Sequence, residues 1–195
     1  MAARTGGEAG TAAAPPVVPE PGWEAVQPLR IEGGRGSFVS GDPEGDRVRV
    51  AYFRRAADGA LVGRAWLGPG AEGPPGHVHG GATAAVLDEA MGAAAWMAGW
   101  VVVAVHLEID FRRMVPLGTD AWMEARVDRV EGRKVLTRGR LHDAAGEDFA
   151  TAAGVFVTLD PERFEELLGR VARAMGTGLP ELLQEMRRRG FRGVD

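Results

Sequence analysis

The chain has 195 residues, of which 45% are hydrophobic and 26% charged, as in an ordinary soluble protein that buries a core of its own. It contains no cysteine, which excludes disulfides, thiolate metal sites and a cysteine nucleophile, and fits a reducing compartment. Its net charge of -4 gives no reason to expect a nucleic acid as partner.

Residues 1–22 are rich in alanine, glycine and proline, so we expect a disordered leader. They lack the apolar stretch of a signal peptide and the arginine-rich composition of a transit peptide. The longest uncharged, mostly apolar run in the chain has sixteen residues, 90–105, whereas a membrane helix needs about twenty. We therefore expect a soluble, cytoplasmic protein without a membrane span.

Residues 23–160 have the pattern of one compact domain. A Gly/Pro loop at 68–76, in which we expect neither helix nor strand, precedes a helix from Gly81 to about Met97. Alternation of polar and apolar residues predicts strands at 47–54, 61–67, 101–112, 121–130, 134–142 and 149–158. The last four are expected to form a meander, which gives an α+β domain with an antiparallel sheet.

The central helix is apolar nearly all round. Between Gly81 and Trp100 the side chains that are neither apolar nor glycine are Thr83, Asp88 and Glu89. A surface helix would carry a polar stripe, so we expect the sheet to enclose this helix. Enclosure makes Asp88 costly unless it has a partner or a chemical role. Glu89 points about 100° away from Asp88 and is interpreted as structural or exposed.

Residues 161–195 are predicted to form a helical C-terminal tail. The apolar residues that carry the helical spacing are Phe164, Leu167, Leu168, Val171 and Met175, followed by Leu182, Leu183 and Met186 in a second short helix. The tail ends in arginines that we interpret as solvated.

The start of the central helix has the features of an oxyanion hole. The first N–H groups of a helix lack an internal partner and carry the positive end of its dipole. Gly80 and Gly81 have no Cβ, so a carbonyl can approach this backbone closely. Asp88 lies seven residues beyond Gly81, roughly 10 Å along the helix axis. That separation suggests a composite site, in which Asp88 of one subunit lies beside Gly81 of an antiparallel neighbour.

The segment HGGATAAVLDEAMGAAA at 79–95 resembles the HGG-type hotdog thioesterases, and the likeness covers about residues 70–159 through LEIDFRRMVPLG, VEGRK and AGVFVTL. The resemblance implies a hotdog fold, in which an antiparallel sheet wraps around one long helix. It also implies hydrolysis of an acyl-CoA thioester by a homodimer, which in part of the family pairs into a homotetramer. No metal and no organic cofactor are expected, since coenzyme A enters as part of the substrate.

The resemblance also assigns roles to individual residues. Gly81 is expected to polarise the thioester carbonyl, with Gly80 in the substrate site and His79 close to the thioester. Asp88 of the partner subunit is expected to activate water or to attack the carbonyl itself. The basic residues expected to meet the nucleotide phosphates, at the rim of the cleft, are Arg112, Arg113, Arg133 and Lys134.

One departure from the family pattern concerns Ala104, where some relatives have a threonine that holds the attacking water. His106, two residues later and expected to face the same side, is a candidate substitute. Met91, Trp96 and Trp100 are candidates to line the acyl pocket.

Several alternatives remain open from the sequence. His77 and His79 have the spacing of a metal pair on a strand, or His79 only caps the helix, and Asp88 could be a buried acid paired with an arginine. A hotdog domain can also be a non-catalytic acyl-CoA sensor, or a hydroxyacyl-thioester dehydratase or hydratase. The dehydratase signature Asp-x-Asn-Pro-(Leu/Ile)-His does not occur in this chain.

Overall fold

The computed structural model describes residues 17–26, 37–159, 161–174, 176, 178–188 and 190–192. The elements in these residues are β1 (Trp23–Ala25), β2 (Val48–Arg55), β3 (Leu61–Leu67), the 3-10 turn η1 (Pro69–Ala71), α1 (Gly80–Met97), β4 (Val102–Phe111), β5 (Thr119–Glu131), β6 (Lys134–His142), β7 (Asp148–Thr158), α2 (Pro161–Ala174) and α3 (Leu179–Arg188). Of the predicted leader, residues 1–16 lie outside the described part, and residues 17–22 precede β1 without forming a helix or strand. Among the described helices, none combines the length and hydropathy of a membrane span.

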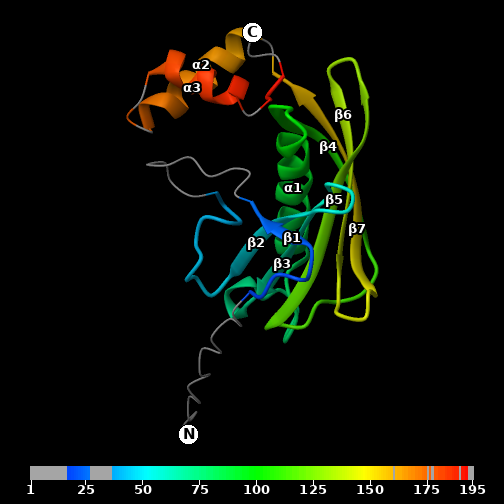
Figure 1. Ribbon diagram of the computed structural model, residues 1–195. Helices are drawn as coiled ribbons and strands as arrows, with labels where there is room; N and C mark the ends of the chain where they lie inside the picture. The colour runs from blue at the N-terminus through cyan, green and yellow to red at the C-terminus, as the bar shows by residue number, and fades with distance from the viewer. Residues whose placement is uncertain are drawn as a thin grey trace, which may run out of the picture.

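The seven strands form an antiparallel sheet in the order β1-β2-β3-β5-β6-β7-β4, which curls around α1 (Figure 1). The predicted hotdog arrangement is therefore confirmed. The predicted four-strand meander is wrong: β5, β6 and β7 are consecutive neighbours, whereas β4 pairs with β7 at the edge. Alternation identifies the buried face of a strand but not its neighbours in the sheet, so the crossover from β4 to β5 has no signal in the pattern.

Two further elements differ from the expectation. Strand β1 was not predicted, and it pairs with β2 through the register Trp23↔Arg55 to Ala25↔Phe53. The loop expected to contain neither helix nor strand holds η1, with Pro69 in its first turn. Both are three residues long, and segments this short show no periodicity.

The core lies between α1 and the concave face of the sheet. Met91 fits into space left by glycines on two strands: a Cβ on Gly139 would lie 3.1 Å from the Met91 side chain, and one on Gly154 would lie 3.3 Å from it. Met91 is completely buried there. It is therefore a core residue, and the expectation that it lines an acyl pocket is wrong.

The helical tail packs on the C-terminal end of α1 (Figure 1), where Val101, Leu168 and Met186 form a small second core. The Phe191 ring lies 5.8 Å from the Trp96 ring in an edge-to-face contact. The Arg192 guanidinium lies 4.9 Å from the centre of the Trp100 ring. The predicted tail helices are thus confirmed, while the side chains of Phe164, Val171 and Met175 lie outside the described part.

Candidate active site

His79 is the N-cap residue of α1. Its backbone is extended, with φ -64° and ψ 133°, and its N–H donates to the Ala71 carbonyl at 2.8 Å. A Cβ on Gly73 would lie 2.7 Å from the Cα of His79, so glycine allows the preceding loop to pack against this residue. The His79 ring then turns back over the helix, where Nδ1 accepts a hydrogen bond from the Gly81 N–H at 2.9 Å. His79 therefore caps the N-terminus of α1, which is one of the alternatives that the sequence allowed.

The two glycines at the helix start therefore differ. The Gly81 N–H is occupied by the His79 ring, whereas the Gly80 N–H has no acceptor within the described residues. A Cβ on Gly80 would lie 3.5 Å from the ring of Phe111, the exposed last residue of β4. The free donor of the helix start thus lies beside the end of β4.

Asp88 lies on the side of α1 that faces β7 and β4. Gly92, one turn later on the same side, lies against Phe156 of β7, whose ring would be 3.5 Å from a Cβ there. Asp88 is half-buried, and within the described residues its carboxylate has no hydrogen bond or ion pair. Partial burial, and then the negative charge of Glu89, raise the pKa of the Asp88 carboxyl above its ordinary value. The alternative of an arginine partner finds no support in the described part of the chain.

Glu89 has the opposite surroundings, although it is the next residue. Its carboxylate accepts a hydrogen bond from the Tyr52 hydroxyl of β2 at 2.8 Å and another from the Ser37 hydroxyl. Burial, and then the Glu89 carboxylate, raise the pKa of the Tyr52 phenol well above its ordinary value. This carboxylate has a structural role, in agreement with the interpretation made from the sequence.

Strand β4 forms the outer edge of the sheet. It pairs with β7 on one side, and the described residues offer no strand to its other side. Val103 and Val105 are 43% and 57% exposed, and Phe111 at the end of the strand and Met114 three residues beyond it are exposed as well. An edge strand with exposed apolar side chains is a template for pairing with a further chain.

The predicted substitution of His106 for a missing threonine is wrong in its geometry. Ala104 pairs with Phe156 and His106 pairs with Val155, because a β-bulge inserts Val105 between them. Consecutive residues of β7 face opposite sides of the sheet, so Ala104 and His106 do so too. His106 therefore points away from α1.

The four basic residues expected at the coenzyme A phosphates form two separate groups. The Arg113 guanidinium bonds Asp143 at 2.8 Å and the Glu147 carbonyl at 2.6 Å, and Arg112 pairs with Asp110 at 3.1 Å, all in exposed positions. Arg133 donates to the Thr158 carbonyl at the opposite end of the sheet, next to Lys134. The two groups are separated by the length of β6, roughly 25 Å. One chain cannot bring both to one nucleotide.

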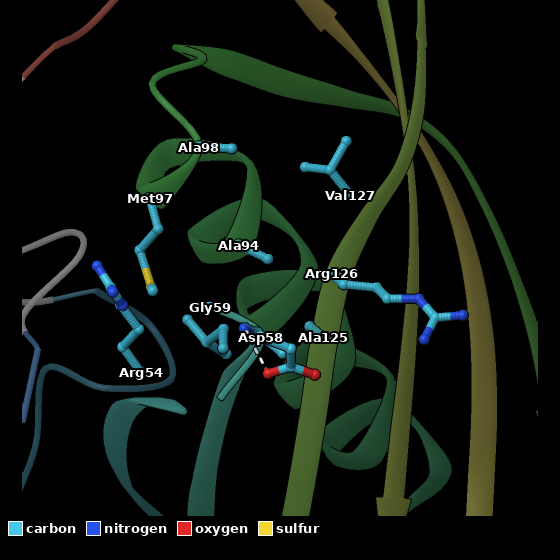
Figure 2. A pocket seen from close by; sticks show the side chains of 11 residues that line it. Arg54, Asp58, Gly59, Ala94, Met97, Ala98, Ala125, Arg126 and Val127 are labelled. Atoms are coloured by element: carbon cyan, nitrogen blue, oxygen red, sulfur yellow. Dashed lines mark hydrogen bonds between the residues drawn. The ribbon is translucent and has the colours of Figure 1, made fainter. Parts of the chain in front are cut away.

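A pocket of about 460 Å³ lies beside the C-terminal half of α1 (Figure 2), and neither Gly80 nor Asp88 is among the residues that line it. Figure 2 shows Met97, Ala94 and Ala98 of α1 on one side of this pocket and β5 on the other, with the Arg126 side chain pointing away. The remaining residues that line the pocket are Arg54, Asp58, Gly59, Ala60, Leu61, Ala125 and Val127. Trp96 and Trp100 are not among the lining residues, since both contact the tail.

Sequence reasoning missed Tyr52 and Ser37. Tyr52 is the only tyrosine of the chain, and the alternation of β2 places it on the same side as Val48 and Val50, a buried position that requires a partner for its hydroxyl. That signal was present, whereas Ser37 has none. No group of three or more His, Asp or Glu side chains suited to a metal ion occurs in the described residues.

Comparisons with known proteins agree with this architecture. Residues 75–150 match the family model described as the thioesterase superfamily. The acyl-coenzyme A thioesterase THEM4 of Xenopus laevis is 31% identical over 140 residues, which are 71% of this chain and 63% of that protein. The chain thus spans less than two thirds of the length of this relative.

Two solved structures are also similar. A thioesterase superfamily protein has a TM-score of 0.59 at 28% identity, over 68% of each chain. The BH2602 protein of Bacillus halodurans, solved with CoA, has a TM-score of 0.50 at 28% identity, over 56% of this chain and 73% of that one.

Proposed function

We propose that this chain, a hotdog-fold member of the thioesterase superfamily, hydrolyses an acyl-CoA thioester to a free acid and coenzyme A. The proposal is supported by a relative named as an acyl-coenzyme A thioesterase and by a similar structure solved with CoA. The observation that carries it is that, among the described residues, the half-buried Asp88 carboxylate has no partner and the Gly80 N–H at the start of the same helix has no acceptor.

The N–H groups at the start of α1 would polarise the thioester carbonyl. The Gly80 N–H is available as the structure stands, and the absence of a Cβ leaves its approach open. The Gly81 N–H becomes available once the His79 ring turns away, which would leave that ring beside the thioester. Donors fixed at a helix start stabilise the negative oxygen that develops during acyl transfer.

Asp88 would supply the base or the nucleophile from the partner subunit. It is eight residues from Gly80, about 12 Å along the helix, which is too far for both to act on one carbonyl. Pairing of two β4 edges around a two-fold axis would bring the helices together antiparallel, each Asp88 near the other helix start. The exposed apolar edge of β4 supports this homodimer, and its pairing into a tetramer is a further expectation.

The arrangement also bears on where the nucleotide would bind. Arg112 and Arg113 lie at the end of β4 next to Gly80, so they are candidates for the phosphates of a substrate held there. Arg133 and Lys134 could contribute only from another subunit. The cytoplasmic location and the absence of a metal or organic cofactor remain predictions.

Release of free thiol from a panel of acyl-CoAs tests the proposal. Asp88→Asn keeps the shape of the side chain and should lower kcat by about 10²- to 10⁴-fold, the contribution of a general base. Asp128→Asn, on the outer face of β5, is the matched control and should keep the activity. Undiminished hydrolysis by Asp88→Asn would contradict the role of this residue.

The same panel distinguishes a sensor, for which the small Ala104 and the capped Gly81 N–H argue. A sensor would bind acyl-CoA tightly without releasing thiol. Single-turnover hydrolysis in heavy-oxygen water separates the two roles of Asp88, since label enters its carboxyl only if it attacks the carbonyl itself.

A further inference from the structure

Glu89 ties α1 to β2. The helix packs on β3, β4, β5, β6 and β7 through apolar side chains. Toward β2, by contrast, it presents the carboxylate of Glu89, which accepts hydrogen bonds from the hydroxyls of Tyr52 and Ser37. Tyr52 is buried and stiff, so its hydroxyl is a fixed point. These two bonds therefore hold the Glu89 carboxylate in place and, together with the apolar packing, the rotation of α1.

The rotation of α1 decides where Asp88 points. Neighbouring residues of a helix are 100° apart, so a helix that keeps Glu89 on β2 directs Asp88 toward β7 and the β4 edge. The proposed site needs Asp88 at that edge, because its substrate would be held by another subunit. The tie between Glu89 and Tyr52 is thus well placed to orient the reacting carboxyl.

Glu89 is also the charge next to Asp88 in sequence, and within the described part of the chain the strands around the helix carry others. Residues paired across strands share a face and alternate along each strand, which puts the charged residues of β3 through β7 on the convex face. Those on β4 are His106, Glu108 and Asp110, the one on β7 is Asp148, and those on β6 are Lys134, Arg138, Arg140 and His142. Strands β3 and β5 contribute Arg64, Asp120, Glu124, Arg126, Asp128, Arg129 and Glu131.

Among the described strands, the charged residues on the concave face lie on β1 and β2. Glu24 and Arg54 pair with each other across these strands, and their side chains are 3.9 Å apart. Arg54 lines the pocket beside Met97, two turns of helix beyond Glu89. At the start of α1, two turns before Asp88, the His79 ring accepts a hydrogen bond from the Gly81 N–H. Glu89 is therefore the described charge that acts most directly on Asp88, in agreement with its contribution to the raised pKa of that carboxyl.

We propose that Glu89, held by Tyr52 and Ser37, is a positioning residue for the proposed hydrolysis: it orients Asp88 toward the subunit edge and places a fixed negative charge beside it. This inference rests on the proposed function, since it presumes that Asp88 is the reacting carboxyl. It separates two roles, charge and orientation, that different substitutions remove.

The charge is removed by Glu89→Gln, which keeps the length of the side chain and its ability to accept hydroxyl hydrogen bonds. Loss of a neighbouring negative charge lowers the pKa of Asp88. The acid limb of kcat/KM against pH, which reports the essential base of the free enzyme, should therefore move to lower pH. A weaker base also lowers the plateau of the profile.

The orientation is loosened by Tyr52→Phe, and Ser37→Ala removes the second bond. Both keep the Glu89 carboxylate, so the acid limb should stay close to its wild-type position. The plateau of kcat should fall, on the order of tenfold for Tyr52→Phe, as expected when a reacting group is imperfectly placed. A fall without a displaced limb distinguishes orientation from charge.

A titration of the Asp88 carboxyl carbon by nuclear magnetic resonance, in the full-length wild type and in Glu89→Gln, measures the charge directly. It requires no catalysis, so it holds even if Asp88→Asn turns out to be active and the proposed reaction fails. The expected result is a lower midpoint in Glu89→Gln and little change in Tyr52→Phe. An unchanged midpoint in a folded Glu89→Gln protein, together with an unchanged limb, would overturn the inference. If Glu89→Gln does not fold, an unaltered kcat in Tyr52→Phe would overturn it.

Discussion

Helix α1 carries two neighbouring partly buried acids, Asp88 and Glu89, on different sides, and their surroundings are opposite. On the β2 side, the polar atoms of Glu89 are satisfied by hydroxyls of the same chain. On the β4 side, Asp88 has no partner in the described residues, and the adjoining strand has an unpaired edge with exposed apolar side chains. The β2 side is thus satisfied within the chain, and the proposed function has the β4 side completed by a second chain and a substrate.

The largest effect is expected from a substitution that blocks the exposed edge of β4. Val105→Arg places a charge on the exposed, bulged residue of β4 and should shift the protein to a monomer with most of its thioesterase activity lost. Val130→Arg is the matched control, because Val130 is 40% exposed but lies at the far end of β5. Size-exclusion chromatography with light scattering and a thiol-release assay give both readouts. A Val105→Arg dimer with full activity would mean that the edge of β4 is not the interface.

The next largest effect concerns the helix start. Gly80→Val places a branched side chain over the free N–H, and should lower kcat by about 10²- to 10³-fold, as for the loss of an oxyanion-hole donor. Gly81→Ala places a Cβ 2.9 Å from His79 Nδ1, so it should displace the His79 ring and act less strongly. The kinetics of both variants with one acyl-CoA measure the contrast. Equal losses would contradict the larger contribution expected of the Gly80 N–H.

A moderate effect on stability is expected from the loss of a hydrogen bond to Glu89. Tyr52→Phe leaves one hydrogen bond to the Glu89 carboxylate unmade, which should lower the free energy of unfolding by about 1.5–3 kcal/mol. Urea unfolding followed by circular dichroism measures this difference. Ser37→Ala, which removes the second donor, is expected to act in the same direction. A Tyr52→Phe protein as stable as the wild type would contradict the fixed tie between α1 and β2.

The smallest effect is a gain of stability expected when Asp88 loses its charge. Because the pKa of Asp88 is raised in the folded chain, this group favours the folded state below its unfolded pKa and loses that contribution as the pH rises through the folded pKa. Asp88→Asn should therefore be more stable than the wild type at neutral pH, and the difference should shrink toward acid pH. Thermal unfolding at several pH values tests this. A variant that is less stable at neutral pH would contradict an unpaired, desolvated carboxylate.

Local patterns predicted much of the fold. Alternation predicted the bounds of β3 and β6 correctly, and the run of small and apolar residues predicted α1 to within one residue at its start. The position of β4 beside β7 is a long-range pairing, and the bulge at Val105 reversed the face of His106. Neither leaves a mark in a single sequence, because periodicity describes a strand and not its neighbours.

The candidate site was predictable only in part. The glycines and Asp88 could be singled out by the chemistry of a helix start and by the cost of burying an acid. The hydrogen bond from Gly81 to His79, by contrast, depends on a side-chain rotamer. The partners of Glu89 are 37 and 52 residues away in sequence, so the contrast between the two acids appears only in three dimensions.

The composite site is tested most directly by mixing two inactive variants, Asp88→Asn and Gly80→Val. If each site joins the helix start of one subunit to Asp88 of the other, a mixed dimer has one intact site. Random reassortment of equal amounts should then restore about a quarter of the wild-type activity, since half of the dimers are mixed and each has one of two sites. If helix start and acid act within one chain, no mixed dimer has an intact site, and the mixture would remain as inactive as its components.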